Sequence, residues 1–246
     1  MEYLERSYRE MHRQQDLVHF QVVVKETDLD IGVCKDRYSP ALAKWTENLV
    51  LEARRPLEEY IKRDPQFLNA LTPYSLLPGA PQIVQEMAWA AELAGVGPMA
   101  AVAGTMAAWV GKELSRRSRE VIVENGGDIY IRTSRLRTVG IFAGQSPLSN
   151  RVALEIRPTQ SPLGVCTSSG RVGPSLSLGK ADAVVILSPE TSLADAVATA
   201  TGNLVQGKED IGDAVNWASQ VPGVSGALVI MDDQLAAWGQ IKLCPL

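Results

Sequence analysis

Short apolar stretches with strand-like patterning occur at the start of the sequence and return in its second half. Residues 17–25 have the composition of a strand, and residues 29–34 alternate apolar and polar positions after a short Thr-Asp turn. Together they predict an antiparallel hairpin. Further strands are expected at 121–124, 129–132, 138–142, 152–156, 183–187, 226–230 and 239–243.

Helical periodicity fills the other apolar stretches. Ser39-Pro40 opens a helix expected over 40–62, with a shift at Pro56 because proline disturbs a helix interior. After a proline-rich loop, helices are expected at 81–94, 98–114, 191–203 and 211–219. Strands and helices are segregated along the chain, which favours an α+β fold over a doubly wound parallel sheet. Small residues crowd the 98–114 helix, so we expect it to be buried with close backbone contacts.

Composition places the chain among ordinary globular proteins. Of its 246 residues, 46% are hydrophobic and 21% are charged, so extended disorder is not expected. No change in composition marks a second domain, and we expect one domain over residues 1–246. The net charge of −4 offers no basic field that would attract nucleic acid.

Neither a membrane segment nor a disulfide framework is expected. The longest apolar stretches, 87–94 and 99–108, are shorter than the roughly 20 residues that cross a bilayer. The charged N-terminus lacks the apolar core of a signal peptide, so we expect a cytoplasmic protein without membrane partners. Cys34, Cys166 and Cys244 form neither a C-x-x-C pair nor an even set, which argues against disulfides and a cysteine zinc site.

The segment 188–203 contains the most informative polar pair. Asp195 and Thr199 lie one helical turn apart and would present two oxygens on one face. Such oxygens suit Mg²⁺, which takes one or two protein carboxylates and completes its shell with water or nucleotide phosphates. The alternative is a capping box with Ser192 as N-cap, Asp195 as its partner and Gly202 ending the helix. Because such helix starts are commoner than metal sites, these residues alone favour the capping box.

A glycine pair provides a second candidate site. Asn125-Gly126 between apolar strands is typical of a hairpin turn, which would explain the motif without any ligand. Gly126 and Gly127 also leave room for a flat ring or a diphosphate against bare backbone. Asp128, which follows them, is a further candidate contact.

Hydroxyl and cationic side chains gather in a third segment. Thr167, Ser168 and Ser169, followed by Gly170-Arg171, suit an anion such as a diphosphate. A polar surface turn explains the same residues equally well. Lys180 is either a phosphate contact or simply the solvent-side start of the next strand, and both interpretations stay open.

Taken in order, the segments 124–131, 164–171, 179–183 and 194–200 resemble the ApbE-like superfamily, which includes the FAD:protein FMN transferases. The sequences of segments 95–104 and 124–128 are similar to those typical of a short, soluble branch of that superfamily. The resemblance covers roughly residues 3–243. It implies an α+β fold of the ApbE-like kind. Two related lobes of sheet and helices would form one compact unit with a cleft between them.

The resemblance also implies a ligand and a reaction. A flavin nucleotide, FAD or FMN, would be bound through its phosphates, with Mg²⁺ held by Asp195 and Thr199. The residues expected to contact the nucleotide are Gly126, Gly127, Asp128, Thr167, Ser168, Ser169, Arg171 and Lys180. If the protein is catalytic, FMN would pass from FAD to a Ser or Thr hydroxyl of a protein acceptor.

One departure from the transferases bears on catalysis. They carry a histidine downstream of their Thr-Ser-Gly motif, near the place where this chain reads Gly173-Pro174-Ser175. The only histidines are His12 and His19, so no residue is assigned as the catalytic base. A non-catalytic flavin or nucleotide carrier is therefore the alternative to a transferase, and a protein without a ligand is the third hypothesis. Homo-oligomerisation stays open.

Overall fold

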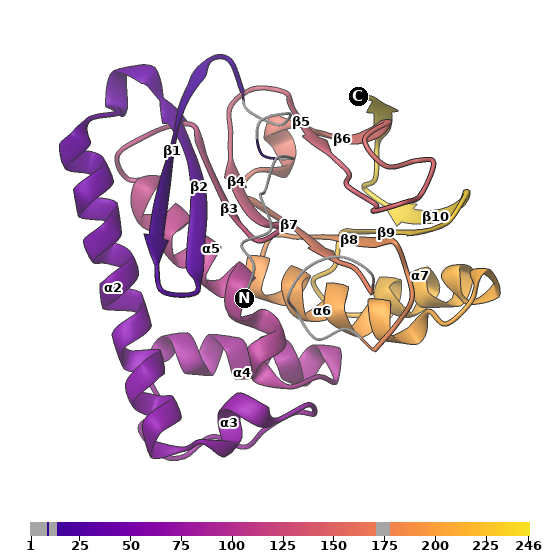
Figure 1. Cartoon of the computed structure of the whole chain (residues 1–246), viewed down its shortest axis with the longest axis horizontal. Helices are drawn as coiled ribbons and strands as arrows, with labels where there is room; N and C mark the ends of the chain where they lie inside the picture. The colour runs from indigo at the N-terminus through magenta and orange to yellow at the C-terminus, as the bar shows by residue number, and fades with distance from the viewer. Residues whose placement is uncertain (1–8, 10–13, 171–177) are drawn as a thin grey trace.

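An eight-stranded antiparallel sheet runs through the middle of the molecule (Figure 1). The structure is a computed structural model that describes residue 9 and residues 14–170 and 178–246. The strand order is β1-β2-β3-β4-β7-β8-β9-β10. These strands are β1 (Leu17–Val24), β2 (Thr27–Cys34), β3 (Val121–Asn125), β4 (Asp128–Arg132), β7 (Leu163–Ser168), β8 (Ala183–Ser188), β9 (Gly226–Met231) and β10 (Gln234–Gly239).

Helices cover one face of this sheet and a small sheet covers part of the other (Figure 1). The helices are α2 (Pro40–Arg63), α3 (Gln66–Asn69), α4 (Gln82–Ala94), α5 (Val102–Leu114), α6 (Thr191–Leu204) and α7 (Ile211–Gln220). The small sheet has the order β11-β6-β5, with β5 (Arg137–Gly140), β6 (Val152–Ile156) and β11 (Leu243–Pro245). Strand alternation separates the two cores: Cys166 of β7 packs with the helices, and Val165 packs with the small sheet.

The order of the elements repeats once along the chain. The hairpin β1-β2 is followed by helices and then by the hairpin β3-β4, and the hairpin β7-β8 is followed by helices and then by the hairpin β9-β10. In each half the first helix packs on the first hairpin and the last helix packs on the second. The expected α+β fold with two related lobes is confirmed, and one continuous sheet joins the lobes.

Three expected elements differ from those observed. The α2 helix continues through Pro56, because buried side chains on both sides of the proline, such as Ala53 and Leu57, hold it against the core. The expected 98–114 helix is divided into a 3₁₀ turn, Pro98–Ala101, and α5. The closing strand expected at 239–243 is wrong, since Gly239 ends β10 with a φ of 75° and the chain pairs again only at β11.

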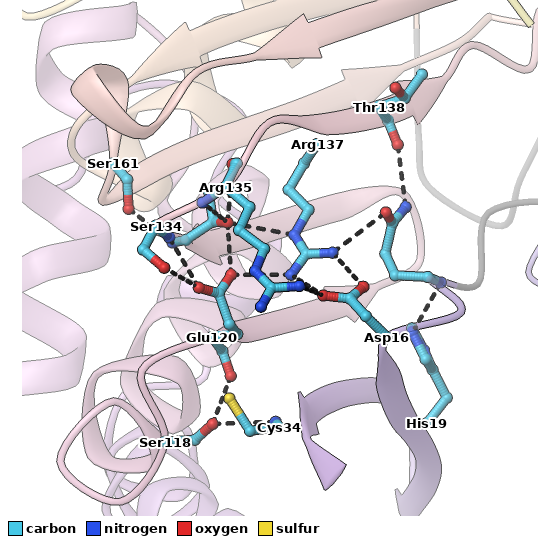
Figure 2. Close-up of polar contacts among 12 residues, drawn as sticks. Asp16, His19, Cys34, Ser118, Glu120, Ser134, Arg135, Arg137, Thr138 and Ser161 are labelled. Carbon is cyan, nitrogen blue, oxygen red and sulfur yellow. Dashed lines mark hydrogen bonds and ion pairs between the residues drawn. The ribbon is translucent and has the colours of Figure 1, made fainter.

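A buried ion cluster joins the small sheet to the first strands of the main sheet (Figure 2). Arg137 on β5 is 3% exposed and donates to Asp16 at 2.6 Å and to Glu120 at 2.9 Å. Glu120 also accepts hydrogen bonds from the hydroxyls of Thr133 and Ser134. Burial alone would raise the pKa of Glu120, but these hydrogen bonds outweigh it and lower that pKa to about 2. The cluster is therefore held together as ion pairs at neutral pH.

Within the part of the chain that the structure describes, no single helix is long and apolar enough to cross a membrane. The segments Gln82–Ala94 and Pro98–Leu114 meet the length and composition requirement only as a pair, bent by 104°. The three cysteines are free thiols, with Cys34 and Cys166 buried.

Candidate functional site around Asp128 and Asp195

Three segments that are distant in the sequence meet between β4, β7 and α6. Pairing of β4 with β7 sets Ile129 opposite Val165, which brings Asp128 beside Cys166. The α6 helix lies along β7, where the Cys166 thiol contacts the Thr191 carbonyl oxygen at 3.4 Å. Asp128, Cys166 of β7 and the first turns of α6 therefore lie at one place in the fold.

Asp195 lies in the second turn of α6 and bonds to a different helix. The N–H of Gly104, near the start of α5, donates to its Oδ2 at 2.8 Å. Burial raises the pKa of Asp195 to about 7, although hydrogen bonds from the N–H groups of Gly104 and Ala103 favour the charged form. The capping-box interpretation is wrong: Glu190 is the N-cap of α6, and the Ser192 hydroxyl has no hydrogen-bond partner.

Asp128 is a second buried carboxylate in the same place. The Cys166 thiol and the N–H of Thr167 lie beside it and favour its charged form, yet its Oδ1 has no hydrogen-bond partner. Burial and the charge of nearby Asp195 raise the pKa of Asp128 well above its usual value. The negative charge of each carboxylate disfavours ionisation of the other, so the two groups titrate as a pair and not independently.

Two glycines let the start of α6 pack closely on α5 of the first lobe and on β7 of its own lobe. A Cβ on Gly104 of α5 would lie 2.6 Å from the Thr191 carbonyl oxygen and 2.7 Å from the Asp195 Cβ. A Cβ on Gly164 of β7 would lie 2.6 Å from the Thr191 Cα. The start of α6 is thus fixed against α5 and β7 through backbone contacts, which sets the position of Asp195.

The Gly126-Gly127 pair forms the two-residue turn between β3 and β4. Asn125 pairs with Asp128, and the φ angles of Gly126 and Gly127 are 69° and 106°, as a primed hairpin turn requires. The expected hairpin is confirmed. Space beside Gly127 remains open, since a Cβ there would be no nearer than 3.7 Å to the Thr167 carbonyl oxygen. Whether this backbone contacts a nucleotide stays a prediction.

The hydroxyl segment is divided between the two faces of the sheet. Ser168 faces the helices, where its Oγ lies 3.6 Å from a Cβ placed on Gly202 of α6. Thr167, one residue earlier, projects from the opposite face by strand alternation. Ser169 follows β7 and is partly buried. Arg171 lies outside the described residues, as does the Gly173-Pro174-Ser175 segment.

Lys180 lies near the C-terminal end of α6 rather than near Asp195. Its N–H donates to the Val205 carbonyl at 2.8 Å, and its side chain is exposed. Gly179 packs so tightly on this end of the helix that a Cβ would meet the Gly202 oxygen at 1.8 Å. The structure therefore separates Lys180 from the carboxylate pair by most of the length of α6.

The one described histidine belongs to a different part of the molecule. Both ring nitrogens of His19 on β1 have partners: Nδ1 lies 3.0 Å from Asp30 Oδ2, and Nε2 accepts from the Gln14 N–H at 3.3 Å. The ring lies beside the Asp16–Arg137 ion cluster (Figure 2). His12 is outside the described residues. Among those described, no imidazole reaches Asp195.

Comparison with known proteins identifies the family. The family model described as AbpE bacteria matches residues 9–236. The chain belongs to this ApbE-like family. A UPF0280 protein of Methanosarcina acetivorans is 42% identical over 225 residues, covering 91% of this chain and 86% of the relative. A UPF0280 protein of Methanococcus aeolicus is 39% identical over 232 residues, covering 92% of this chain and 91% of the relative.

Solved ApbE structures share the fold of this family member. The flavin transferase ApbE from Vibrio cholerae has a TM-score of 0.54 and 13% identity, covering 91% of this chain and 96% of that one. The ApbE protein from Thermotoga maritima has a TM-score of 0.56 and 12% identity, covering 89% of this chain and 96% of that one. At such low identity the likeness establishes the fold alone.

The donors in this ApbE-like chain fit a hard cation. Asp128 Oδ1 is buried and unpartnered, and Asp195 keeps lone pairs beyond the bond from Gly104. Thr199, half-buried, follows Asp195 by one turn on the same face of α6. Across the described ranges, no group of three or more His, Cys, Asp or Glu side chains is arranged to hold a metal. An oxygen set completed by phosphates or water is the chemistry that Mg²⁺ prefers.

Two surface hollows lie away from the carboxylate pair. One of about 450 Å³ is lined by Pro65, Gln66, Asn69, Ala70 and Tyr74. The other, about 350 Å³, is lined by Glu155, Arg157, Thr159, Gln160, Gln240, Ile241 and Lys242. Neither includes a site residue expected from the sequence. Neither hollow is the expected cleft between the lobes. The lobes instead contact each other directly at Gly104.

Sequence reasoning missed three residues that shape the site. Gly104 allows α5 to meet α6, and the run of small residues in the 98–114 segment was the available signal for it. Cys166 lies beside Asp128 and contacts the start of α6, and burial raises the pKa of its thiol well above the usual value, so it stays protonated. Thr191 bounds the site from the first turn of α6. Nothing in the local sequence around Cys166 or Thr191 indicated these contacts.

Proposed function

We propose that this protein binds a flavin nucleotide, FAD or FMN, together with Mg²⁺ held by Asp195 and Thr199. The observation that carries the proposal is the buried Asp128–Asp195 pair, with an unpartnered oxygen, where β4, β7 and α6 meet. Two acids in a buried place are costly unless a cation compensates them. Membership of the ApbE-like family and the fold shared with a flavin transferase favour a flavin nucleotide as the ligand that brings phosphates to that cation.

The reaction we propose is transfer of FMN from FAD to a Ser or Thr hydroxyl of a protein acceptor. The acceptor oxygen would bond to the FMN phosphorus and lose its proton to water, while the diphosphate bond would break and AMP would leave with the bonding electron pair. When bound, Mg²⁺ supplies positive charge to the phosphate oxygens in such a step. Asp195 and Thr199 would hold the cation, and the backbone of Gly126 and Gly127 would leave room for the nucleotide.

The other residues expected to contact the nucleotide lie at different distances from the proposed cation. Asp128 faces α6 at the proposed cation site, whereas Ser168 faces the last turn of α6 at Gly202. Thr167 projects from the other face of the sheet, so it would act through its main chain or from the end of the strand. Ser169 and Arg171, which follow β7 in the sequence, would bind phosphate by hydrogen bonding and charge. Lys180 lies at the C-terminal end of α6, away from Asp195, and would contribute only longer-range positive charge.

A flavin carrier without catalysis is the second candidate function. It is favoured by the partners of His19, whose two ring nitrogens are engaged by Asp30 and Gln14 on the far side of the sheet. No imidazole among the described residues is then available to take the acceptor's proton. The three free thiols suit a reducing compartment, and we propose the cytoplasm as the location.

Incubation of the purified protein with FAD, Mg²⁺ and a candidate acceptor, followed by intact mass spectrometry, tests these functions. A transferase adds the mass of FMN to the acceptor, and Asp195→Asn abolishes that gain without unfolding the protein. A carrier gives no mass gain but releases flavin on denaturation. Asp64→Asn is the matched control, because Asp64 is also buried but lies at the end of α2, where it bonds Tyr60 and Tyr74. Full activity in Asp195→Asn would refute the metal assignment.

A further inference from the structure

We propose that Asp128 is a second carboxylate ligand of the cation that Asp195 and Thr199 bind. The inference rests on the proposed function and adds a residue from the first lobe to a site otherwise built on α6. It goes beyond nucleotide contact, because it assigns a specific oxygen, Oδ1 of Asp128, to a hard divalent cation.

The position of Asp128 is fixed by the fold. It is the first residue of β4, directly after the two-residue turn, and its strand is held by pairing with β3 and β7. Strand alternation puts its side chain on the same face of β4 as Tyr130, which packs with the helices. Asp128 thus lies opposite Cys166 of β7, whose thiol contacts α6 at Thr191.

One carboxylate oxygen of Asp128 is buried without a hydrogen-bond donor in the described ranges. Asp128 is 7% exposed, and its Oδ1 finds no donor among the described residues. A buried acceptor without a donor costs free energy comparable to a lost hydrogen bond. Cys166, opposite Asp128 on β7, contacts the Thr191 carbonyl of α6, one turn before Asp195, so this oxygen and the Asp195 carboxylate belong to one site.

Neither carboxylate forms an ion pair with a basic side chain in the described part of the chain. A further acid, Glu124, lies on the opposite face of the sheet, where the Arg9 Nε donates to it at 2.6 Å. Among the described residues, burial therefore disfavours charge on both carboxylates with no basic side chain to offset it, and a bound cation would favour their ionised form. Two carboxylates and a hydroxyl, completed by phosphate or water oxygens, match the donors that Mg²⁺ and Mn²⁺ take.

Mn²⁺ alone, followed by electron paramagnetic resonance of the free ion, is the direct probe of this site. The wild type is expected to bind one Mn²⁺ per chain at the pair. Asp128→Asn and Asp195→Asn are each expected to weaken Mn²⁺ binding at least about tenfold. Loss of a group that only hydrogen-bonds a metal ligand already lowers metal affinity by about that factor. Asp64→Asn, a buried aspartate at the end of α2, is expected to bind Mn²⁺ like the wild type.

A thermal measurement gives a second readout. Because Asp128 and Asp195 come from different lobes, bound Mn²⁺ links the lobes and raises the unfolding temperature. Asp128→Asn keeps the size of the side chain and should fold, and its unfolding temperature should respond little to Mn²⁺. Should that variant not fold, Asp128→Ser, which is smaller and uncharged, takes its place in both measurements.

The outcomes separate this inference from the function on which it rests. If Asp195→Asn loses Mn²⁺ while Asp128→Asn binds it as the wild type does, the second ligand is overturned and the proposed function stands. If the wild type binds neither Mn²⁺ nor flavin, the proposed function fails and the inference fails with it. Loss of Mn²⁺ binding in both variants, with binding kept in Asp64→Asn, supports both.

Discussion

The Asp195 carboxylate accepts a hydrogen bond at 2.8 Å from the N–H of Gly104, a residue 91 positions earlier in the chain. The bond joins α6 of the second lobe to the first turn of α5 in the first lobe. N–H groups in the first turn of a helix lack partners within that helix and favour a negative charge. The proposed metal ligand is thus also a link between the lobes, and its position depends on how closely the two helices approach.

Gly104→Ala is expected to lower the free energy of unfolding by about 2 kcal/mol, because the new Cβ would overlap the backbone at Thr191 and the Asp195 side chain. Urea unfolding measures the change. Gly212→Ala on α7 is the matched control, since nothing lies within 4 Å of a Cβ at that position. It should be neutral or stabilising by up to about 1 kcal/mol. Equal behaviour of the two variants would contradict the close approach of α5 and α6.

Replacement of Arg137 by methionine is expected to destabilise the protein by about 3 kcal/mol, because it leaves Glu120 buried without its guanidinium partner. Chemical unfolding at neutral pH checks the value. Arg116→Met serves as control, as Arg116 forms only an exposed pair with Glu113 and its loss should cost less than about 0.5 kcal/mol. A cost for Arg137→Met as small as that of the control would show that the cluster contributes nothing to stability.

Stability should fall in acid through Glu120. Its pKa of about 2 in the folded protein lies below the usual 4.5, so the stabilisation is fully present above pH 4.5 and is lost as the pH falls towards 2. The shift corresponds to about 3 kcal/mol. Unfolding curves between pH 6 and 2 should show a steeper loss in the wild type than in Glu120→Gln. Parallel curves for the two proteins would remove Glu120 as the cause.

Native thiol labelling should reach Cys244 and spare the other two cysteines. Cys34 and Cys166 are buried, and burial raises the pKa of the Cys166 thiol well above its usual value. An alkylating reagent attacks the thiolate, so neither accessibility nor charge favours Cys166. Intact mass should show one adduct on the folded protein and three after denaturation. Labelling of the Cys166 peptide under native conditions would mean that the carboxylate pair is open to solvent.

Local chemistry explains what the sequence determined correctly. The Asn125-Gly126-Gly127-Asp128 turn follows from the need for positive φ at two central positions, which glycine meets without strain. The periodicity of 17–34 and of 191–203 depends on neighbours a few residues away, so the β1-β2 hairpin and α6 could be predicted. The motif order further sufficed to place the chain in its family.

Only the tertiary structure decided which groups meet in the site. Asp195 has the same sequence context in a capping box and in a metal site, and packing of α6 against Gly104 gave it a partner on another helix. In the same way, pairing of β4 with β7 brought Asp128 to Cys166, and strand alternation turned Thr167 to the other face. Periodicity and turn chemistry are local, whereas burial and charge coupling depend on contacts between segments far apart in the chain, which no short stretch of sequence encodes.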